Sequence, residues 1–227
     1  MVKNKKVSCI IPAYNEENRI SNVLKVVVNH PLIDEVIVVN DCSKDNTLEK
    51  IRAFKKVKVL DNKKNLGKTA SVLRALKISK HEIAVFIDAD LLELNKKNIS
   101  DLILPVLTGK SKTSLAMLGN LPVFKIIGAD SGSGQRALIK NLLNFKKIAE
   151  LAPYGLESYI NSEIIKNKYP IKIITWENVI CTTKGEKANS AFPFWSYVSM
   201  WIQMIKTSGF FAFLFQSFQL ARLNIKS

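Results

Sequence analysis

The chain has 227 residues, of which 47% are hydrophobic, and it carries a formal net charge of +15. This length and apolar content exclude an intrinsically disordered chain and indicate one large domain, or one domain with an appendage. The basic residues are scattered as lysine pairs, which indicates attraction to an anionic partner without identifying it. No stacking-aromatic motif or compact arginine-rich stripe is present, so we do not expect nucleic-acid binding.

Strand and helix patterns alternate strictly through the first part of the chain. We predict strands over Val7–Ile11, Glu35–Asn40, Lys56–Leu60 and Ile83–Asp90. The intervening segments have apolar residues at helical spacing, and Asn15 is expected to cap the first helix after Pro12 ends the first strand. The alternation predicts an α/β fold, with an open Rossmann-like, mostly parallel sheet and helices on both faces.

The second half of the chain is less regular. We predict further strands over Thr113–Leu118 and Ile171–Trp176, and helices over Ile99–Leu107, Gly134–Phe145 and Leu156–Lys166.

The tail from residue 188 differs in character from the rest. Between Ala188 and Leu220 the only charged residue is Lys206, and ten of the nineteen aromatic residues lie from Phe192 to Phe218. A spanning helix needs about 20 predominantly apolar residues, whereas small and polar residues interrupt this stretch. It therefore favours two amphipathic helices in a membrane interface; packing on the domain's own core or on a second subunit is the alternative.

Three cysteines, Cys9, Cys42 and Cys181, lie far apart and have no metal-ligand spacing. Together with a start that lacks the apolar core of a signal peptide, they indicate a reducing compartment. We expect a cytoplasmic location, at the inner face of the cell membrane if the tail is interfacial.

Two carboxylates, Asp88 and Asp90, follow a short apolar run. If they extend the strand they share a face, roughly 6.6 Å apart, at the carboxyl end where α/β sheets bind ligands. Two hard oxygen ligands suit Mg²⁺ or Mn²⁺ carrying a diphosphate. The alternative is a pair of turn-forming aspartates.

Four short motifs follow the ends of the predicted strands. They are Pro12-Ala13-Tyr14-Asn15-Glu16-Glu17, Val39-Asn40-Asp41-Cys42-Ser43-Lys44-Asp45-Asn46-Thr47, Asn65-Leu66-Gly67-Lys68 and Asp88-Ala89-Asp90. In this order they resemble the motifs of family 2 glycosyltransferases with a GT-A fold. The likeness spans about residues 7–180 and is firm to about residue 92. It departs where Asn40 replaces the usual aspartate and Cys42 the usual glycine, so the turn geometry there is expected to differ.

The resemblance implies a GT-A domain over residues 1–187, with a nucleotide-binding half (1–92) and an acceptor half (93–187), followed by the tail (188–227). It implies that Asp90 holds the metal, while Asp88 contacts the ribose or shares the ion. Asp41 would accept from a uracil-type base and Lys68 would lie near phosphate. The implied nucleotide-sugar-binding residues are Pro12, Ala13, Tyr14, Glu16, Asp41, Asn65, Gly67, Lys68, Asp88 and Ala89.

Acceptor-side residues are expected in a small polar loop that enters a helix. Ser131, Gly132, Gln135 and Arg136 suit close backbone approach and anion binding, with Arg136 able to bind phosphate bidentately. Glu157 lies where the family often carries its catalytic acid and would act as a general base toward an acceptor hydroxyl. The alternative for Glu157 is a helix N-terminal residue favoured by the macrodipole.

The sequence thus predicts a metal-dependent hexosyltransferase that moves a sugar from a UDP-type donor by inverting single displacement. The acceptor would be a lipid phosphate or a cell-envelope glycan. With a phosphate acceptor no base is needed, because a phosphate ester is already ionised near pH 7. Two alternatives stay open: a retaining transferase similar to glucosyl-3-phosphoglycerate synthase, and a nucleotide-binding interaction protein without catalysis. The tail would mediate peripheral membrane association or homo-oligomer formation.

Overall fold

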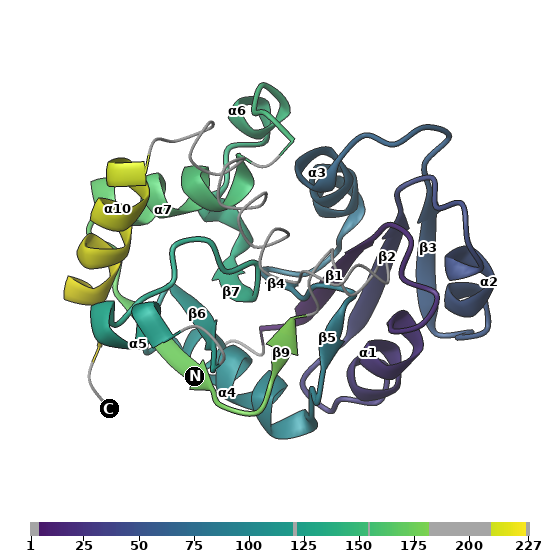
Figure 1. Ribbon diagram of the computed structural model, residues 1–227, viewed down its shortest axis with the longest axis horizontal. Helices are drawn as coiled ribbons and strands as arrows, with labels where there is room; N and C mark the ends of the chain where they lie inside the picture. The colour runs from purple at the N-terminus through teal and green to yellow at the C-terminus, as the bar shows by residue number, and fades with distance from the viewer. Residues whose placement is uncertain (1–4, 120–121, 154, 182–209, 226–227) are drawn as a thin grey trace, which may run out of the picture.

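The computed structural model describes residues 5–119, 122–153, 155–181 and 210–225, and Figure 1 shows their arrangement. The first part of the chain forms β1 (Val7–Ala13), α1 (Ile20–Val27), β2 (Glu35–Asn40), α2 (Thr47–Arg52), β3 (Val57–Asp61), α3 (Lys68–Ile78), β4 (Ile83–Phe86) and β5 (Leu91–Leu92). The second part forms α4 (Lys96–Leu107), β6 (Thr113–Leu118), α5 (Pro122–Ile127), β7 (Arg136–Ile139), the 3₁₀ turn η1 (Lys140–Leu142), α6 (Phe145–Ala149), α7 (Leu156–Lys166), β8 (Ile171–Trp176), β9 (Ile180–Cys181) and α10 (Phe210–Arg222).

A seven-stranded sheet organises the domain, with the strand order β3-β2-β1-β4-β7-β6-β8. Its neighbouring strands are parallel except where β7 pairs with β4 and β6, and β5 and β9 form a separate antiparallel ribbon. The predicted α/β class with an open, mostly parallel sheet is confirmed.

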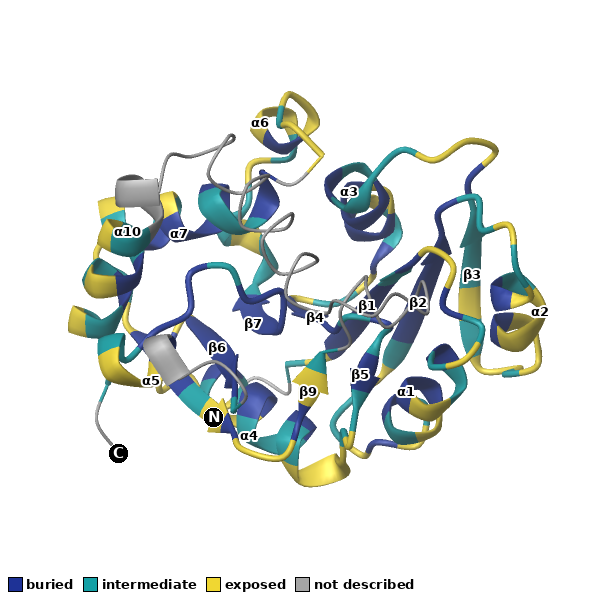
Figure 2. Cartoon of the chain, viewed as in Figure 1, coloured by how far each residue is buried: buried dark blue, intermediate teal, exposed yellow. Residues whose placement is uncertain are grey.

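Helices cover both faces of the sheet, so the central strands are buried on both sides (Figures 1 and 2). Successive side chains of a strand point to opposite faces. In β1, Cys9 and Ile11 therefore join the core under α1, α2 and α4, whereas Ile10 joins the core under α3, α7 and α10. Burial on both faces explains why these strands appear in the sequence as continuous apolar runs.

The predicted helix over Gly134–Phe145 is wrong. This segment contains the strand β7, then η1, and only afterwards begins the short helix α6 at Phe145. Ala137 and Leu138 are both buried because β7 lies inside the sheet. A short apolar run of a central strand cannot be distinguished from a buried helix by periodicity alone.

Pro12 does not end the first strand, since β1 continues to Ala13 and pairs Pro12 with Val39 of β2. On the other side β4 pairs with β1 only as far as Ile10. The missing N–H of Pro12 therefore removes no ladder bond to β4, and the proline is tolerated in the strand.

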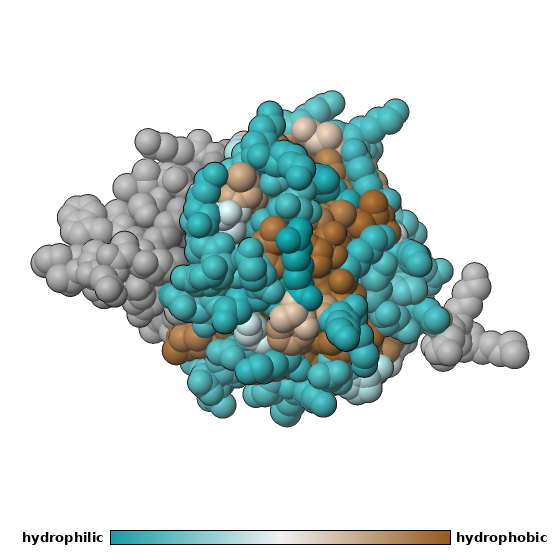
Figure 3. Space-filling model, turned by 90° about the vertical axis from the view of Figure 1, so that its right-hand side faces the viewer, coloured by the Kyte–Doolittle hydropathy of each residue, from teal (hydrophilic) through white to brown (hydrophobic). Residues whose placement is uncertain are grey.

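The β3 end of the sheet is an edge, where Val57, Val59 and Leu60 are half-buried and Lys58 is exposed. Figure 3 shows this end of the molecule, with an apolar strip bordered by hydrophilic side chains. Charged residues along an edge strand oppose pairing with the edge of another sheet.

The predicted tail is described only in part, because residues 188–209, 226 and 227 lie outside the described residues. Its described part contains α10, which lies beside α7 and α5 (Figure 1). Leu220 and Ser217 of α10 are buried, whereas Phe215 and Phe218 are 63% and 55% exposed. Among the helices that the structure describes, none combines the length and apolar character needed to cross a bilayer.

Candidate nucleotide and transfer site

The loops that follow β1 and β2 are held together by hydrogen bonds between the first and second motifs. The Asn15 N–H donates to Ser43 Oγ at 3.0 Å, and Asn15 Oδ1 accepts from the Lys44 N–H at 2.8 Å. The Glu16 N–H donates to Thr47 Oγ1 at 2.7 Å. Asn15 therefore does not cap α1, where Arg19 is the N-cap and makes no side-chain capping bond. It connects the two loops instead.

The two departures from the family pattern have local explanations. Asn40 Nδ2 donates to Asp61 Oδ1 at 2.8 Å, so an aspartate at position 40 would place two carboxylates against each other. Cys42 has a φ of +63°, the left-handed conformation in which glycine is favoured. The turn therefore retains the glycine-type conformation even though the residue is cysteine.

Asp41 organises the third motif. Its carboxylate accepts from the N–H groups of Leu66 and Gly67, each at 2.8 Å, and from Asn62 Nδ2 at 2.6 Å. Asp41 is 4% exposed, and this arrangement holds the loop that begins α3. The sequence predicted Asp41 as a base-binding residue and gave no sign that it also binds this loop.

Gly67 is one of the points where the two parts of the chain lie in close contact. Its φ is +83°, and a Cβ atom there would lie 2.9 Å from Pro153 Cβ. Beside it, the Thr69 N–H and Oγ1 donate to the Pro153 carbonyl oxygen at 3.1 and 2.7 Å. The close approach explains why a glycine occupies this position.

Asp88 and Asp90 lie beyond β4, which ends at Phe86, so the prediction that they share one strand face is wrong. Asp88 is instead oriented by Gln135, in a two-point contact. The Asp88 N–H donates to Gln135 Oε1 at 3.0 Å, and Gln135 Nε2 donates to Asp88 Oδ2 at 2.7 Å. Gln135 thus fixes the first carboxylate of the pair.

Asp90 directly precedes β5, in which Leu91 is paired with Cys181 of β9. The Cys181 thiol lies close enough to donate to Asp90 Oδ2, at 3.4 Å. The strand β9, near residue 181, is therefore brought beside Asp90.

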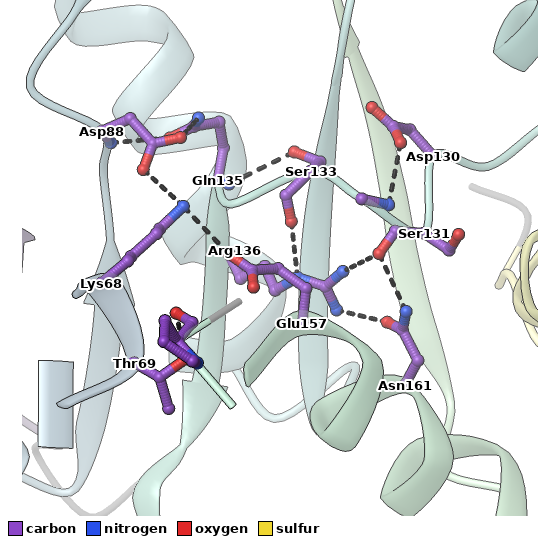
Figure 4. A network of polar contacts seen from close by, with 12 residues as sticks. Lys68, Thr69, Asp88, Asp130, Ser131, Ser133, Gln135, Arg136, Glu157 and Asn161 are labelled. Atoms are coloured by element: carbon purple, nitrogen blue, oxygen red, sulfur yellow. Dashed lines mark hydrogen bonds and ion pairs between the residues drawn. The ribbon is translucent and has the colours of Figure 1, made fainter. Parts of the chain in front are cut away.

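Lys68 joins the two halves through two ion pairs, as Figure 4 shows. Its Nζ lies 2.8 Å from Asp88 Oδ1 and 2.9 Å from Glu157 Oε1. Burial by itself would lower the pKa of Lys68, but the two carboxylates outweigh it and raise that pKa above its ordinary value. Lys68 is therefore a fixed cation between Asp88 and α7.

Gly134 lies against this ion-paired cluster. A Cβ atom at this position would clash with Lys68 Nζ and would lie 2.7 Å from Asp88 Oδ2. A small hollow of about 10 Å³, which has room for one water molecule, lies beside the cluster, with Pro12, Arg136 and Glu157 among its lining residues.

Arg136 occupies a different position from the one predicted. It is 1% exposed, and its guanidinium donates to the carbonyl oxygens of Ser131 at 2.9 Å and Ser133 at 2.8 Å, and to Asn161 Oδ1 at 2.6 Å (Figure 4). Burial lowers the pKa of Arg136 to about 10, so it remains charged at neutral pH. Its hydrogen bonds hold the Ser131–Ser133 backbone in place of an external phosphate, and the loop enters the strand β7, not a helix.

The same loop is held from its other side by Asp130, whose Oδ1 accepts from the Gly132 N–H at 2.9 Å. Asp130 is 6% exposed, and desolvation is the main cause that raises its pKa to about 6.

The remaining residues predicted to bind the nucleotide sugar differ in their solvent exposure. Tyr14 is 44% exposed and Asn65 is also exposed, whereas Ala13 and Ala89 are buried.

Sequence reasoning missed several residues that shape this site: Asn62, Asp130, Pro153 and Asn161. One signal for Asn161 was available, because it lies four positions after Glu157 and therefore on the same face of the predicted helix. The contacts of Asn62, Asp130 and Pro153 are not visible as a pattern in the sequence.

Comparisons with known proteins bear on the family and the fold of this chain. Residues 8–111 match the family model described as Glycosyl transferase family 2. The chain is 39% identical over 94 residues to a dolichyl-phosphate beta-glucosyltransferase of Trichomonas vaginalis, covering 36% of this chain and 28% of that protein. It is 30% identical over 206 residues to a poly(ribitol-phosphate) beta-N-acetylglucosaminyltransferase of Staphylococcus aureus, covering 75% of this chain and 63% of that protein. The chain thus spans less than two thirds of either relative.

Among solved structures, a glucosyl-3-phosphoglycerate synthase from Mycobacterium tuberculosis, in complex with Mn²⁺, UDP and phosphoglyceric acid, superimposes with a TM-score of 0.66. It is 21% identical, and the match covers 86% of this chain and 77% of that one. At this identity the likeness is one of fold. Residues 8–111, a little under half of the chain, are thus similar to glycosyl transferase family 2, and the chain has the GT-A fold.

Proposed function

We propose that this protein transfers a sugar from a UDP-type nucleotide sugar to a phosphate-bearing or glycan acceptor. The observation that carries the proposal is the position of Lys68, which lies between Asp88 of the fourth motif and Glu157 of α7. A cation at the meeting point of the two halves suits the place where a diphosphate leaves and an acceptor arrives.

The nucleotide side is supported by the preorganised third motif. Asp41 holds Leu66 and Gly67 in place, which allows backbone to approach a nucleotide closely. Each carboxylate oxygen can accept two hydrogen bonds, so Asp41 can also accept from the N–H of a uracil-type base. Lys68, at the start of α3, brings positive charge and a helix N-terminus toward the diphosphate.

The donor set fits a hard divalent ion, Mg²⁺ or Mn²⁺, held by Asp90 and assisted by Asp88. Within the described part of the chain, no three His, Cys, Asp or Glu side chains gather into a metal site, so the diphosphate oxygens would supply further ligands. When bound, such an ion would stabilise the negative charge of the departing diphosphate. The chain's own contribution is to hold Asp88 in one orientation through Gln135.

The role of Glu157 depends on the acceptor. Relatives named for dolichyl phosphate and for poly(ribitol phosphate) favour an acceptor that carries phosphate. If the attacking oxygen belongs to a phosphate, it is already ionised and Glu157 positions Lys68. If it belongs to a hydroxyl, Glu157 takes its proton during direct displacement, with inversion at the sugar carbon. Retention of configuration at the sugar carbon is the second candidate. The fold shared with glucosyl-3-phosphoglycerate synthase favours this candidate.

We further propose that the protein acts at the cytoplasmic face of the membrane, attached peripherally or as a homo-oligomer through residues 188–227. The exposed Phe215 and Phe218 of α10, and Ile126 of α5 at 87% exposure, support an apolar contact on this side. Flotation with anionic lipid vesicles tests the membrane form: a Phe215→Ser/Phe218→Ser protein should float less than the wild type. Equal flotation would contradict a contact through α10.

The activity is tested with a panel of UDP-sugars and Mn²⁺, measuring UDP release and transfer to polyprenyl phosphate or poly(ribitol phosphate). Asp90→Ala should reduce turnover at least about 100-fold, whereas Asp101→Ala on α4 should leave it unchanged. The anomeric configuration of the product decides between inversion and retention. Tight UDP binding without turnover of any donor would overturn the enzymatic assignment and favour a non-catalytic nucleotide-binding protein.

A further inference from the structure

The C-terminal helix α10 presents two different faces. Phe215 and Phe218 point to solvent, while Ser217 and Leu220 are fully buried against the acceptor half. The buried side contacts α7 and α5, which Figure 1 shows beside it. The polar groups on the buried side are not needed for an apolar attachment, so they require a separate explanation.

Two polar residues of α10 reach the loop and helix of the transfer site. The Ser131 N–H donates to Ser217 Oγ at 3.2 Å, and Asn161 Nδ2 donates to Gln216 Oε1 at 3.2 Å. Ser158, on the same helix as Asn161, also contacts the Gln216 amide at 3.3 Å. Because Ser131, Ser217 and Asn161 are buried, losing a partner would leave a polar group unsatisfied.

From Asn161 the contacts continue to the ion-paired cluster. Asn161 binds the Arg136 guanidinium and the Ser131 carbonyl oxygen, and Arg136 binds the carbonyl oxygen of Ser133. The next residue, Gly134, is the one with no room for a Cβ atom beside Lys68 and Asp88. Figure 4 shows the side chains of this path, from Asn161 through Arg136 to the loop.

A second connection runs along α7. Glu157 and Asn161 lie four residues apart, on one face of the helix, and Glu157 pairs with Lys68. Holding Asn161 through Gln216 therefore fixes the face of α7 that carries Glu157. Two routes, the loop and the helix, therefore lead from Asn161 to the surroundings of Lys68.

We infer that Gln216 is a positioning residue for sugar transfer. The helix α10 is then a structural part of the transfer site, in addition to carrying the exposed Phe215 and Phe218. This inference rests on the proposed function. Gln216 acts through Asn161 and does not touch substrate. Loss of the Gln216 side chain displaces the loop and Glu157 relative to Lys68. The conformation of the nucleotide half, which is held by Asp41, is unchanged.

The test uses the full chain with UDP-glucose and Mn²⁺, or whichever UDP-sugar supports turnover. Gln216→Met removes the acceptor at similar volume, Gln216→Glu keeps an acceptor oxygen, and Gln219→Met is the control on the same helix. We expect Gln216→Met to lower kcat about tenfold, with the donor KM and UDP affinity within twofold of wild type. Gln216→Glu should recover most of kcat, and Gln219→Met should match wild type.

A wild-type kcat in Gln216→Met, or equal losses in Gln216→Met and Gln219→Met, would overturn the inference. Hydrogen exchange of residues 130–136 and 157–161 measures the same coupling without turnover. Faster exchange is expected in Gln216→Met and in Ser217→Ala, and unchanged exchange in both would also overturn it. If the wild type turns over no donor, the proposed function fails, while exchange still decides whether α10 positions the loop.

Discussion

The proposed nucleotide half (residues 1–92) and the proposed acceptor half (residues 93–187) of this protein place their polar groups in different ways. In the nucleotide half, parallel strands end at one edge of the sheet, and the loops that follow them bind one another directly, as Asn15 does with Ser43 and Lys44. In the acceptor half, an antiparallel strand interrupts the sheet, and the loop before it is held by buried side chains from β7, α7 and α10.

The first half is thus organised by strand topology. The second is organised by a network of buried hydrogen bonds around Arg136, here called the polar hub, which includes Asp130, Ser131, Ser133 and Asn161. Neighbouring strand ends bring residues close whatever the rest of the domain does. A hub of buried hydrogen bonds works only if each partner is present, because an unsatisfied buried group is costly. The two halves should therefore respond differently to substitution, and Lys68, which belongs to both, should be the most sensitive position.

The largest effect is expected for Lys68→Met, which breaks the connection between the halves. It leaves the carboxylates of Asp88 and Glu157 without their shared cation and removes positive charge from the proposed diphosphate site. Turnover of UDP-sugar should fall about 100-fold or more. Lys64→Met, an exposed residue in the loop before α3, is the control, and a loss of less than threefold at Lys68 would refute the assigned role.

The next effect is expected in the polar hub, where Asp130 is buried near Arg136 and Glu157. Because burial raises the pKa of Asp130 to about 6, its ionisation costs more in the folded than in the unfolded chain. The resulting stability is fully present below the ordinary carboxyl pKa and is lost as pH rises through about 6. Asp130→Asn should therefore stabilise the protein by about 1–3 kcal/mol at pH 7.5 and by little at pH 4. Urea unfolding at both pH values measures the free energy of unfolding. A gain in stability that is the same at both pH values would contradict burial of the ionised Asp130 as its cause.

In the nucleotide half, Asn40→Asp tests the explanation for the missing aspartate of the second motif. The new carboxylate would face Asp61 and should lower the free energy of unfolding by about 2 kcal/mol at pH 7. The penalty should shrink as pH falls and the new carboxyl takes up a proton. The double variant Asn40→Asp/Asp61→Asn restores a donor opposite an acceptor. Recovery of stability in the double variant would support the proposed repulsion between positions 40 and 61. Equal destabilisation of the single and the double variant would refute it.

The smallest effect is expected for Cys42→Gly, in the turn of the same motif. Glycine relieves the left-handed strain at φ +63° but increases the entropy of the unfolded chain. The net gain should be about 0.5 kcal/mol, measured as a shift of the urea midpoint. Cys42→Ala keeps the strain and is the matched comparison; it should not be more stable than Cys42→Gly.

The sequence by itself determined the first half of the fold and its four motifs. Parallel strands that are buried on both faces leave uninterrupted apolar runs, and polar motifs at their ends must come to one edge of the sheet. For this reason the order and spacing of the motifs are enough to assign Asp41, Lys68 and Asp88 to one site. The boundaries of α7 and β8 were also predicted correctly, because a periodic helix and an apolar strand each have a clear local signal.

Only the tertiary structure decided the acceptor half. The segment after Gly134 is a strand because β4 and β6 flank it, and no local preference distinguishes that strand from a helix. The inward direction of Arg136 depends on Ser131, Ser133 and Asn161, and the contact of α10 with Ser131 joins positions 86 residues apart. Contacts between distant residues are set by how the elements pack and leave no periodic trace in the chain. The chemistry of Lys68 was visible in the sequence, but its position between Asp88 and Glu157 was not.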